Sequence, residues 1–156
     1  MALLTPDHFY QDTLAYKGRL IAFDVGTKTL GIAITDRSLT LGSPLKTLHR
    51  STWAHDVPHI KAILQDYNIM GGIVGWPVHM DGTPGARCEM VQKWAEKLLT
   101  FIDLPLCFWD ERLSTAAATD TLLQASLSRK RRKELVDKVA ASYILKSFLE
   151  HYPYTF

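Results

Sequence analysis

The sequence predicts an α/β protein with a mixed five-stranded sheet, in which three antiparallel strands are followed by two parallel ones and helices flank the sheet. Three strand-like segments near the N-terminus are joined by short turns, whereas the later strands alternate with helical segments. A chain of 156 residues with 47% hydrophobic and 22% charged residues is typical of a globular protein. We therefore expect one domain over residues 19–156, preceded by an N-terminal arm over residues 1–18, where no clean period is found.

The antiparallel strands are expected over residues 19–25, 30–36 and 44–48, because the first two are rich in β-branched and aromatic residues. Residues 26–29, which read Gly-Thr-Lys-Thr, are typical of a hairpin turn. Ser51 or Thr52 can cap the helix that follows. The remaining expected elements are that helix to about residue 67, a buried strand at 69–74, a helix containing residues 90–99, a strand at 104–109, a helix capped by Ser114, and a last helix from about 134 to 151.

Composition and cysteine use exclude several classes of protein. A net charge of +2 and a pI near 8.5 favour a polyanionic partner only weakly. Cys88 and Cys107 form no CxxC motif, which argues against a zinc site or a disulfide scaffold and favours a reducing cytoplasm. The first 17 residues lack an export signal, and no apolar run reaches the ~20 residues of a membrane span. We expect a soluble cytoplasmic protein.

Asp24 ends a largely apolar strand. Alternation places it on the strand face that carries Leu20 and Ala22. Because an unpaired buried carboxylate is costly, we expect Asp24 to be paired, hydrogen-bonded to the following turn, or bound to a metal. An aspartate that only caps the turn at Gly26 explains the position about equally well.

Asp137 lies on the apolar stripe of the last helix, because Ala140, Ala141 and Ile144 follow it at helical spacing. The helix dipole alone would explain an exposed carboxylate in the first turns. The two small alanines would let this helix approach the sheet closely. Such an approach would bring Asp137 near the strand ends.

Asp110 and Glu111 follow the strand at 104–109, and alternation points them to opposite faces of the sheet. We expect Glu111 to join a shared site and Asp110 to pair with Arg112 or the backbone. A surface network of these three residues is the alternative, and Asp110 is kept as a further candidate metal ligand.

Three carboxylates from separate elements suit divalent metal chemistry. Mg²⁺ and Mn²⁺ prefer oxygen ligands, and two such ions about 3.5 to 4 Å apart can activate a water and stabilise the leaving oxygen of a phosphodiester. If the fold gathers Asp24, Glu111 and Asp137, the sequence predicts a magnesium-dependent catalytic site, with Mn²⁺ as a substitute.

Basic residues could hold phosphates near such a site. The run at residues 129–133 lies just upstream of Asp137, and it predicts either a phosphate-binding patch with strong salt dependence or a solvated loop. The loop GWPVHMDGTPG permits close approach of a phosphate to backbone amides, with His79 and Asp81 as candidate polar contacts. The candidate nucleic-acid-binding residues are Lys28, Arg112, Arg129, Lys130, Arg131, Arg132 and Lys133.

The segments FDVGTKTLGIAITD, GWPVHMDGT, WDERLST and VDKVAASYIL, in this order and spacing, resemble the YqgF family of RNase H-like nucleases, described as Holliday junction resolvases or pre-16S rRNA nucleases. The resemblance spans about residues 19–150. It implies an RNase H-like fold, two-metal hydrolysis, and a role in maturing the 5′ end of small-subunit ribosomal RNA. The family's acidic positions match Asp24, Glu111 and Asp137. Thr27, Ser114 and Thr115 match family positions near the site, whereas Trp76 and His79 stand where the family loop tends to have Leu and Asn.

We therefore expect a metal-dependent endonuclease that cuts structured nucleic acid, with precursor ribosomal RNA in the pre-ribosomal small subunit as the favoured substrate. A Holliday junction resolvase is one alternative, and a homodimer rather than a monomer would be expected for it. A non-catalytic RNA-binding assembly factor would keep the fold and the basic patch. DVGTKTLGIA also resembles the phosphate hairpin of the sugar kinase and actin superfamily, but the chain is too short for its two domains.

Overall fold

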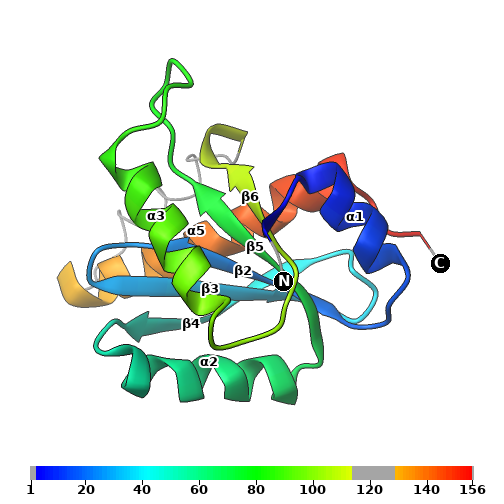
Figure 1. Cartoon of the computed structure of the whole chain (residues 1–156), viewed down its shortest axis with the longest axis horizontal. Coiled ribbons are helices and arrows are strands. Elements are labelled where there is room, and N and C mark those ends of the chain that lie inside the picture. The colour runs from blue at the N-terminus through cyan, green and yellow to red at the C-terminus, as the bar shows by residue number, and fades with distance from the viewer. Residues whose placement is uncertain (1–2, 114–128, 156) are drawn as a thin grey trace.

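A six-stranded mixed sheet forms the centre of the molecule, with strand order β1-β6-β5-β2-β3-β4 (Figure 1). The computed structural model describes residues 3–113 and 129–155. The strands are β1 (Leu3–Leu4), β2 (Arg19–Val25), β3 (Thr29–Thr35), β4 (Gly42–His49), β5 (Ile69–Trp76) and β6 (Leu106–Asp110). The helices are α1 (Pro6–Leu14), α2 (Trp53–Asp66), α3 (Ala86–Leu98) and α5 (Arg129–His151), with a 3₁₀ turn, η1 (Glu111–Leu113), after β6.

The directions of β2 to β6 follow the prediction from sequence. β2, β3 and β4 pair in antiparallel fashion, and Gly26 N–H donates to the Thr29 carbonyl at 2.8 Å to close the first hairpin. β5 and β6 then add in parallel, because α2 and α3 carry the chain back across the sheet. The predicted α/β class, with antiparallel strands followed by parallel ones, is confirmed. β5 runs two residues further than expected, so Gly75 and Trp76 belong to the strand and not to the loop.

The predicted count of five strands is wrong by one, because the N-terminal segment supplies an edge strand. β1 pairs in parallel with the start of β6. Thr5 then caps α1, whose Phe9 is fully buried with its ring 5.7 Å from that of Phe148 in α5. Only Phe9 and Thr13 of α1 are buried, which leaves no helical stripe to read in the sequence. The division into an arm and a domain at residue 18 stays a prediction.

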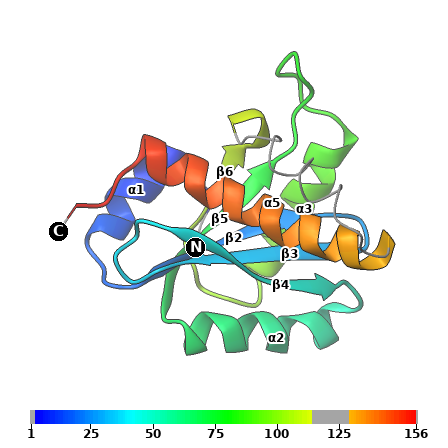
Figure 2. The same ribbon diagram turned by 180° about the vertical axis from the view of Figure 1, so that it is seen from behind.

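Two helical layers cover the sheet. α2 and α3 lie on one face, where Phe23, Ile60 and Trp94 belong to one apolar core. α1 and α5 cover the other face, where Ala22 and Ile144 belong to a second core (Figure 2). β2 is covered on both sides, so its side chains alternate between the two cores. None of the helices in the described ranges is long and apolar enough to span a membrane.

α5 begins earlier than the sequence predicted. The basic run at 129–133 was expected to precede the last helix, but in the structure these residues form its first turns. The helix crosses β3 in direct contact, since a Cβ built on Gly31 would lie 2.1 Å from the backbone oxygen of Asp137. Ala141 is fully buried on the same side of the helix. The close approach predicted from the alanines of the helix therefore depends as much on a glycine of the sheet. The helix predicted after Ser114 lies outside the described residues.

Candidate active site

The three predicted catalytic carboxylates come from separate elements near one end of the sheet. Asp24 is the penultimate residue of β2, and Glu111 opens η1 directly after β6. β2, β5 and β6 are parallel, so their C-terminal ends share one edge of the sheet. Asp137 lies in α5, with its backbone against Gly31, the residue that pairs with Asp24 in the β2–β3 ladder.

Asp24 and Glu111 are hydrogen-bonded to each other. Desolvation raises the pKa of both carboxyl groups. The charge and hydrogen bond of Glu111, and the charge of Asp137, raise the pKa of Asp24 further, to about 8, against a smaller opposite effect of Arg87. Two ionised carboxylates have no hydrogen to share, so one of them must hold a proton. Asp24 therefore donates and Glu111 accepts.

Asp137 is oriented by a threonine at the base of the first hairpin. Its Oδ2 accepts a hydrogen bond from Thr29 Oγ1 at 2.7 Å. Thr29 is buried at the start of β3, so its hydroxyl holds the carboxylate close to the turn that follows Asp24. The negative charge of Asp137 acts on Asp24.

The donor chemistry of this acidic group fits a hard divalent cation. Across residues 3–113 and 129–155, no group of three His, Cys, Asp or Glu side chains is gathered as a complete metal site. Asp24 and Glu111 nevertheless supply carboxylate oxygens in contact with each other, with the charge of Asp137 nearby. Like charge and desolvation raise the pKa of Asp24, and a bound cation would counter both effects. The oxygen donors of these residues are thus of the kind that such an ion prefers.

Asp110 pairs with Arg112 and not with the other carboxylates. Arg112 Nε donates to both Asp110 oxygens, at 3.1 and 3.0 Å, and a terminal guanidinium nitrogen donates at 2.6 Å. This hydrogen bonding holds the pKa of Asp110 below its ordinary value. Asp110, the fourth predicted metal ligand, is therefore neutralised by its neighbour, and Arg112 is not a free cation.

Arg112 also fastens the loop at residues 77–85, by donating a hydrogen bond to the carbonyl of Met80 at 3.2 Å. Two predicted contact residues stabilise this loop from within. The His79 ring packs on Gly85, where an added Cβ would lie 2.5 Å from Nε2. Asp81 Oδ1 accepts hydrogen bonds from the backbone and the hydroxyl of Thr83, at 3.0 and 2.7 Å. The loop thus has a defined shape where it leads into α3.

The other predicted contact residues have different placements. Thr27 and Lys28 are exposed on the β2–β3 turn, next to Asp24. Of the basic run, only the side chain of Arg131 is among those the structure describes, and it is exposed. Ser114 and Thr115 lie outside the described residues.

Sequence reasoning missed three residues that shape the acidic group. Arg87, in the first turn of α3, places a positive charge near Asp24 and Glu111. Thr29 orients Asp137, and Gly75 leaves room for Glu111, because a Cβ there would lie 2.5 Å from Glu111 Oε1. A cation directly after a glycine-rich loop was the one signal available for Arg87.

Replacing Gly75 with alanine tests the predicted catalytic role of Glu111. That role predicts a fall in kcat of roughly 100-fold, because displacing a catalytic group by about 1 Å has an effect of that size. The new methyl group would displace the end of the Glu111 side chain and press on Ile144, 2.7 Å away. Stability should fall by only about 1 kcal/mol, since both obstacles are ends of side chains. Single-turnover kinetics and thermal melts would measure the two effects. The control is Gly72→Ala in the same strand as Gly75, where the added Cβ would clash with Leu106 of β6. This variant should lower stability without a comparable loss of kcat.

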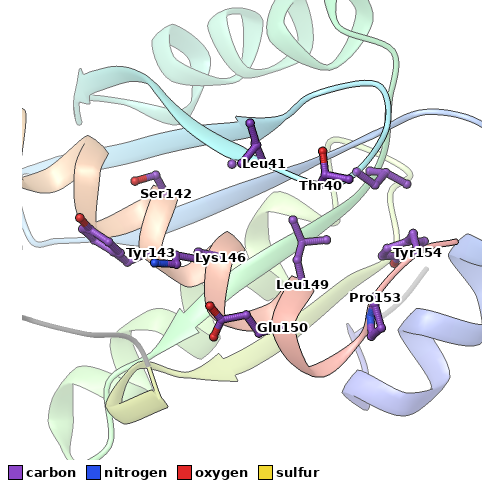
Figure 3. Close-up of a pocket in the computed structure, with 11 residues that line it drawn as sticks. Thr40, Leu41, Ser142, Tyr143, Lys146, Leu149, Glu150, Pro153 and Tyr154 are labelled. Atoms are coloured by element: carbon purple, nitrogen blue, oxygen red, sulfur yellow. The ribbon is translucent and has the colours of Figure 1, made fainter.

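A hollow lies away from the acidic group. This cavity of about 580 Å³ is formed by the β3–β4 turn and the later turns of α5 (Figure 3). Its lining mixes Lys146 and Glu150 with apolar residues such as Leu149. It shares no residue with the acidic group, so we do not count it as part of the candidate active site.

The mixed sheet and the helices on both of its faces define the class of the fold, which is RNase H-like. The RuvC protein of Thermus thermophilus, solved in complex with a Holliday junction substrate, has a similar fold, with a TM-score of 0.51 over 86% of this chain and 95% of that chain at 13% sequence identity. The family model RuvX, described as Holliday junction resolvase, matches residues 18–151. The chain belongs to the RuvX family, which is also called YqgF.

Curated relatives match nearly the whole chain. A protein of Paramagnetospirillum magneticum is 42% identical over 151 residues, which cover 97% of each chain. A protein of Ruegeria sp. is 44% identical over 131 residues, which cover 84% of this chain and 83% of the relative. Both relatives carry the name "Putative pre-16S rRNA nuclease".

Proposed function

We propose that this protein is a divalent-metal-dependent endonuclease that hydrolyses phosphodiester bonds in structured nucleic acid, and that its substrate is the 5′ end of pre-16S rRNA. The observation that carries the proposal is the pair of Asp24 and Glu111, hydrogen-bonded to each other with the charge of Asp137 nearby. The names of the curated relatives support the choice of substrate. We propose that the reaction takes place in the cytoplasm, on the pre-ribosomal small subunit.

Asp24, Glu111 and Asp137 are the proposed metal ligands, and Mg²⁺ is the proposed ion, with Mn²⁺ able to replace it. When bound, the metal would supply an activated water and charge stabilisation for the leaving oxygen. The protein's own residues prepare this site. Thr29 holds Asp137 in place through its hydroxyl, and Gly75 leaves the space that Glu111 occupies.

Charged residues around the acidic group are proposed to position the substrate. Arg87 and Lys28 could contact phosphates, since Arg87 already acts electrostatically on Asp24 and Lys28 is exposed beside it. Arg112 contributes indirectly, by holding Asp110 and the loop at 77–85. The basic first turns of α5, with Arg131 exposed, are a further proposed phosphate contact.

The deciding experiment is cleavage of an end-labelled small-subunit rRNA precursor by the purified protein, with Mg²⁺, Mn²⁺ or EDTA. We expect metal-dependent cutting near the 5′ end of the mature RNA, lost in EDTA. A four-way DNA junction is the second substrate, because the family model is described as a Holliday junction resolvase. If only the junction is cut, the substrate is branched DNA and not precursor rRNA. If RNA is bound but not cut with any metal, the protein is an assembly factor and not a nuclease. Sedimentation would report whether the active species is a monomer or a homodimer.

A further inference from the structure

A groove of about 640 Å³ lies between the start of α2 and α3, on the face of the sheet opposite α5. Its lining includes Arg50, Trp53, Glu89, Lys93, Trp94 and Lys97. None of these residues belongs to the acidic group.

Two features place one end of the groove near the acidic group. The guanidinium group of Arg50 donates a hydrogen bond to the carbonyl of Gly26, and the backbone N–H of Arg50 donates to the carbonyl of Lys28 at 2.8 Å. Arg50 therefore lies under the turn that follows Asp24. On the other wall, Ala86 lines the groove and directly precedes Arg87, whose charge acts on Asp24 and Glu111. In Figure 1 the start of α3 and the β2–β3 turn lie at the same end of the molecule. A chain that leaves the acidic group around the end of the sheet on this side would therefore meet the groove.

The lining is cationic. Arg50, Lys93 and Lys97 outnumber the one carboxylate, Glu89. Glu89 forms an ion pair with Lys93 at 3.1 Å, but both side chains are largely exposed. Exposed pairs of this kind contribute little, so Lys93 can exchange Glu89 for a phosphate at small cost.

A rigid aromatic surface lies beside these cations. Trp53 stacks on Phe101, with ring centroids 5.6 Å apart, and packs beside Trp94 at 6.1 Å. Trp94 is itself held against Phe23 of the sheet. A fixed π-surface beside a row of cations is the combination that binds single-stranded nucleic acid, because bases stack on the ring while phosphates follow the charges.

We propose that this groove binds the single-stranded segment of nucleic acid that flanks the cleaved bond. In this arrangement a base stacks on Trp53 and phosphates contact Arg50, Lys93 and Lys97. The groove would thus select substrates with an unpaired segment next to the cut. This inference rests on the proposed nuclease function for its substrate, but the binding it describes can be measured without cleavage.

The test is binding of a labelled single-stranded RNA oligonucleotide to the full-length Asp24→Asn protein, measured by fluorescence anisotropy over a range of salt concentrations. The double variant Lys93→Glu/Lys97→Glu should weaken binding at least tenfold at low salt. Its plot of log K against log salt should be shallower by about 1.4, since each lost phosphate contact on a single strand contributes about 0.7. The matched control is Lys17→Glu/Lys61→Glu, which changes net charge equally at exposed positions outside the groove.

Trp53 is tested separately, because its loss could disturb the aromatic packing. Trp53→Ala should weaken binding roughly tenfold, in the range observed when a stacking aromatic is removed. RNA that carries 5-iodouridine should cross-link to Trp53 in the otherwise native Asp24→Asn protein, which requires no change in the groove. Cross-links confined to other elements would overturn the proposal.

Other outcomes distinguish this inference from the proposed function. If both lysine double variants weaken RNA binding equally, net charge alone matters, and the proposal that the groove binds RNA is overturned. If polyglutamate displaces the labelled RNA as well as unlabelled RNA does, the partner of the groove is an acidic protein and not nucleic acid. Wild-type protein that binds RNA through the groove but cuts nothing would contradict the proposed function and leave the groove standing. A DNA oligonucleotide, run in parallel, distinguishes the two kinds of nucleic acid.

Discussion

Replacing Asp24 with asparagine is expected to abolish metal-dependent cleavage and, at the same time, to stabilise the metal-free protein. The cleavage rate should fall by roughly 10³-fold or more, because Asp24 is a proposed ligand of a metal ion whose stabilisation of transition-state charge is worth several kcal/mol. The gain in stability has a separate cause. Asparagine has no charge to repel Glu111 and Asp137, and its amide can donate the hydrogen bond that the protonated Asp24 makes to Glu111.

The pH dependence of this stability has a definite sign. Desolvation and the neighbouring carboxylates raise the pKa of Asp24 from 3.8 to about 8. Between these values the folded protein binds more protons than the unfolded chain, so the free energy of unfolding falls as pH rises through this window. The wild-type protein without metal should be least stable, relative to Asp24→Asn, at and above pH 8. Near pH 4 the two proteins should converge.

Thermal melts across this pH range, with and without Mg²⁺, would measure the effect. Magnesium should raise the Tm of the wild type, more so at higher pH because binding displaces the proton, and should leave the variant unchanged. Asp36→Asn is the matched control at the other end of β3. There, hydrogen bonds from Thr40, Leu41 and Ser38 outweigh desolvation and lower the pKa of Asp36 to about 2, so its replacement should reduce stability at neutral pH and preserve cleavage. If the Tm of Asp24→Asn lies below that of the wild type at pH 8, then burial beside Glu111 and Asp137 does not destabilise ionised Asp24.

Replacing Gly31 with alanine is expected to have the second large effect. The added Cβ would lie 2.1 Å from the backbone oxygen of Asp137 and 2.5 Å from its carbonyl carbon, so α5 must move away from the sheet. Stability should fall by about 2 kcal/mol or more, a Tm loss of roughly 4 to 8 °C. Cleavage by the folded protein should also fall at least tenfold, since the helix carries Asp137 away from Thr29.

Gly42→Ala is the matched control for this clash. Its Cβ would lie 2.7 Å from Cβ of Leu145, two turns further along the same helix, so it should destabilise the protein and affect cleavage less. Melts and single-turnover rates below the melting range would separate the two effects. Full stability and activity of Gly31→Ala would mean that α5 does not cross β3 at this point.

The parts of the fold that were predictable depend on local periodicity. β2 has its predicted bounds, and alternation groups Asp24 with Ala22 and, towards the end of β6, Glu111 with Trp109. In the structure Ala22 and Trp109 belong to the core beneath α5. Alternation also separated Asp110 from Glu111, and the structure pairs Asp110 with Arg112. These features follow from the geometry of an extended chain, in which successive side chains point to opposite faces.

The missed features depend on contacts between segments far apart in the chain. β1 exists only because Leu3 meets Leu106, and a two-residue strand has no period of its own. The basic run is helical although its charges suggested a break, because the helix it begins is held on the sheet by Ala141 and Ile144.

By itself, the sequence determined the class of fold and the family, because periodicity and motif order are properties of neighbouring residues. It also predicted the three acidic positions as a site. Only the tertiary structure decided that Asp24 is hydrogen-bonded to Glu111, that Thr29 holds Asp137 across 108 residues of chain, and that Arg87 acts on the acidic group. Desolvation, like-charge repulsion and the room left by a missing Cβ arise only when separate elements are packed together.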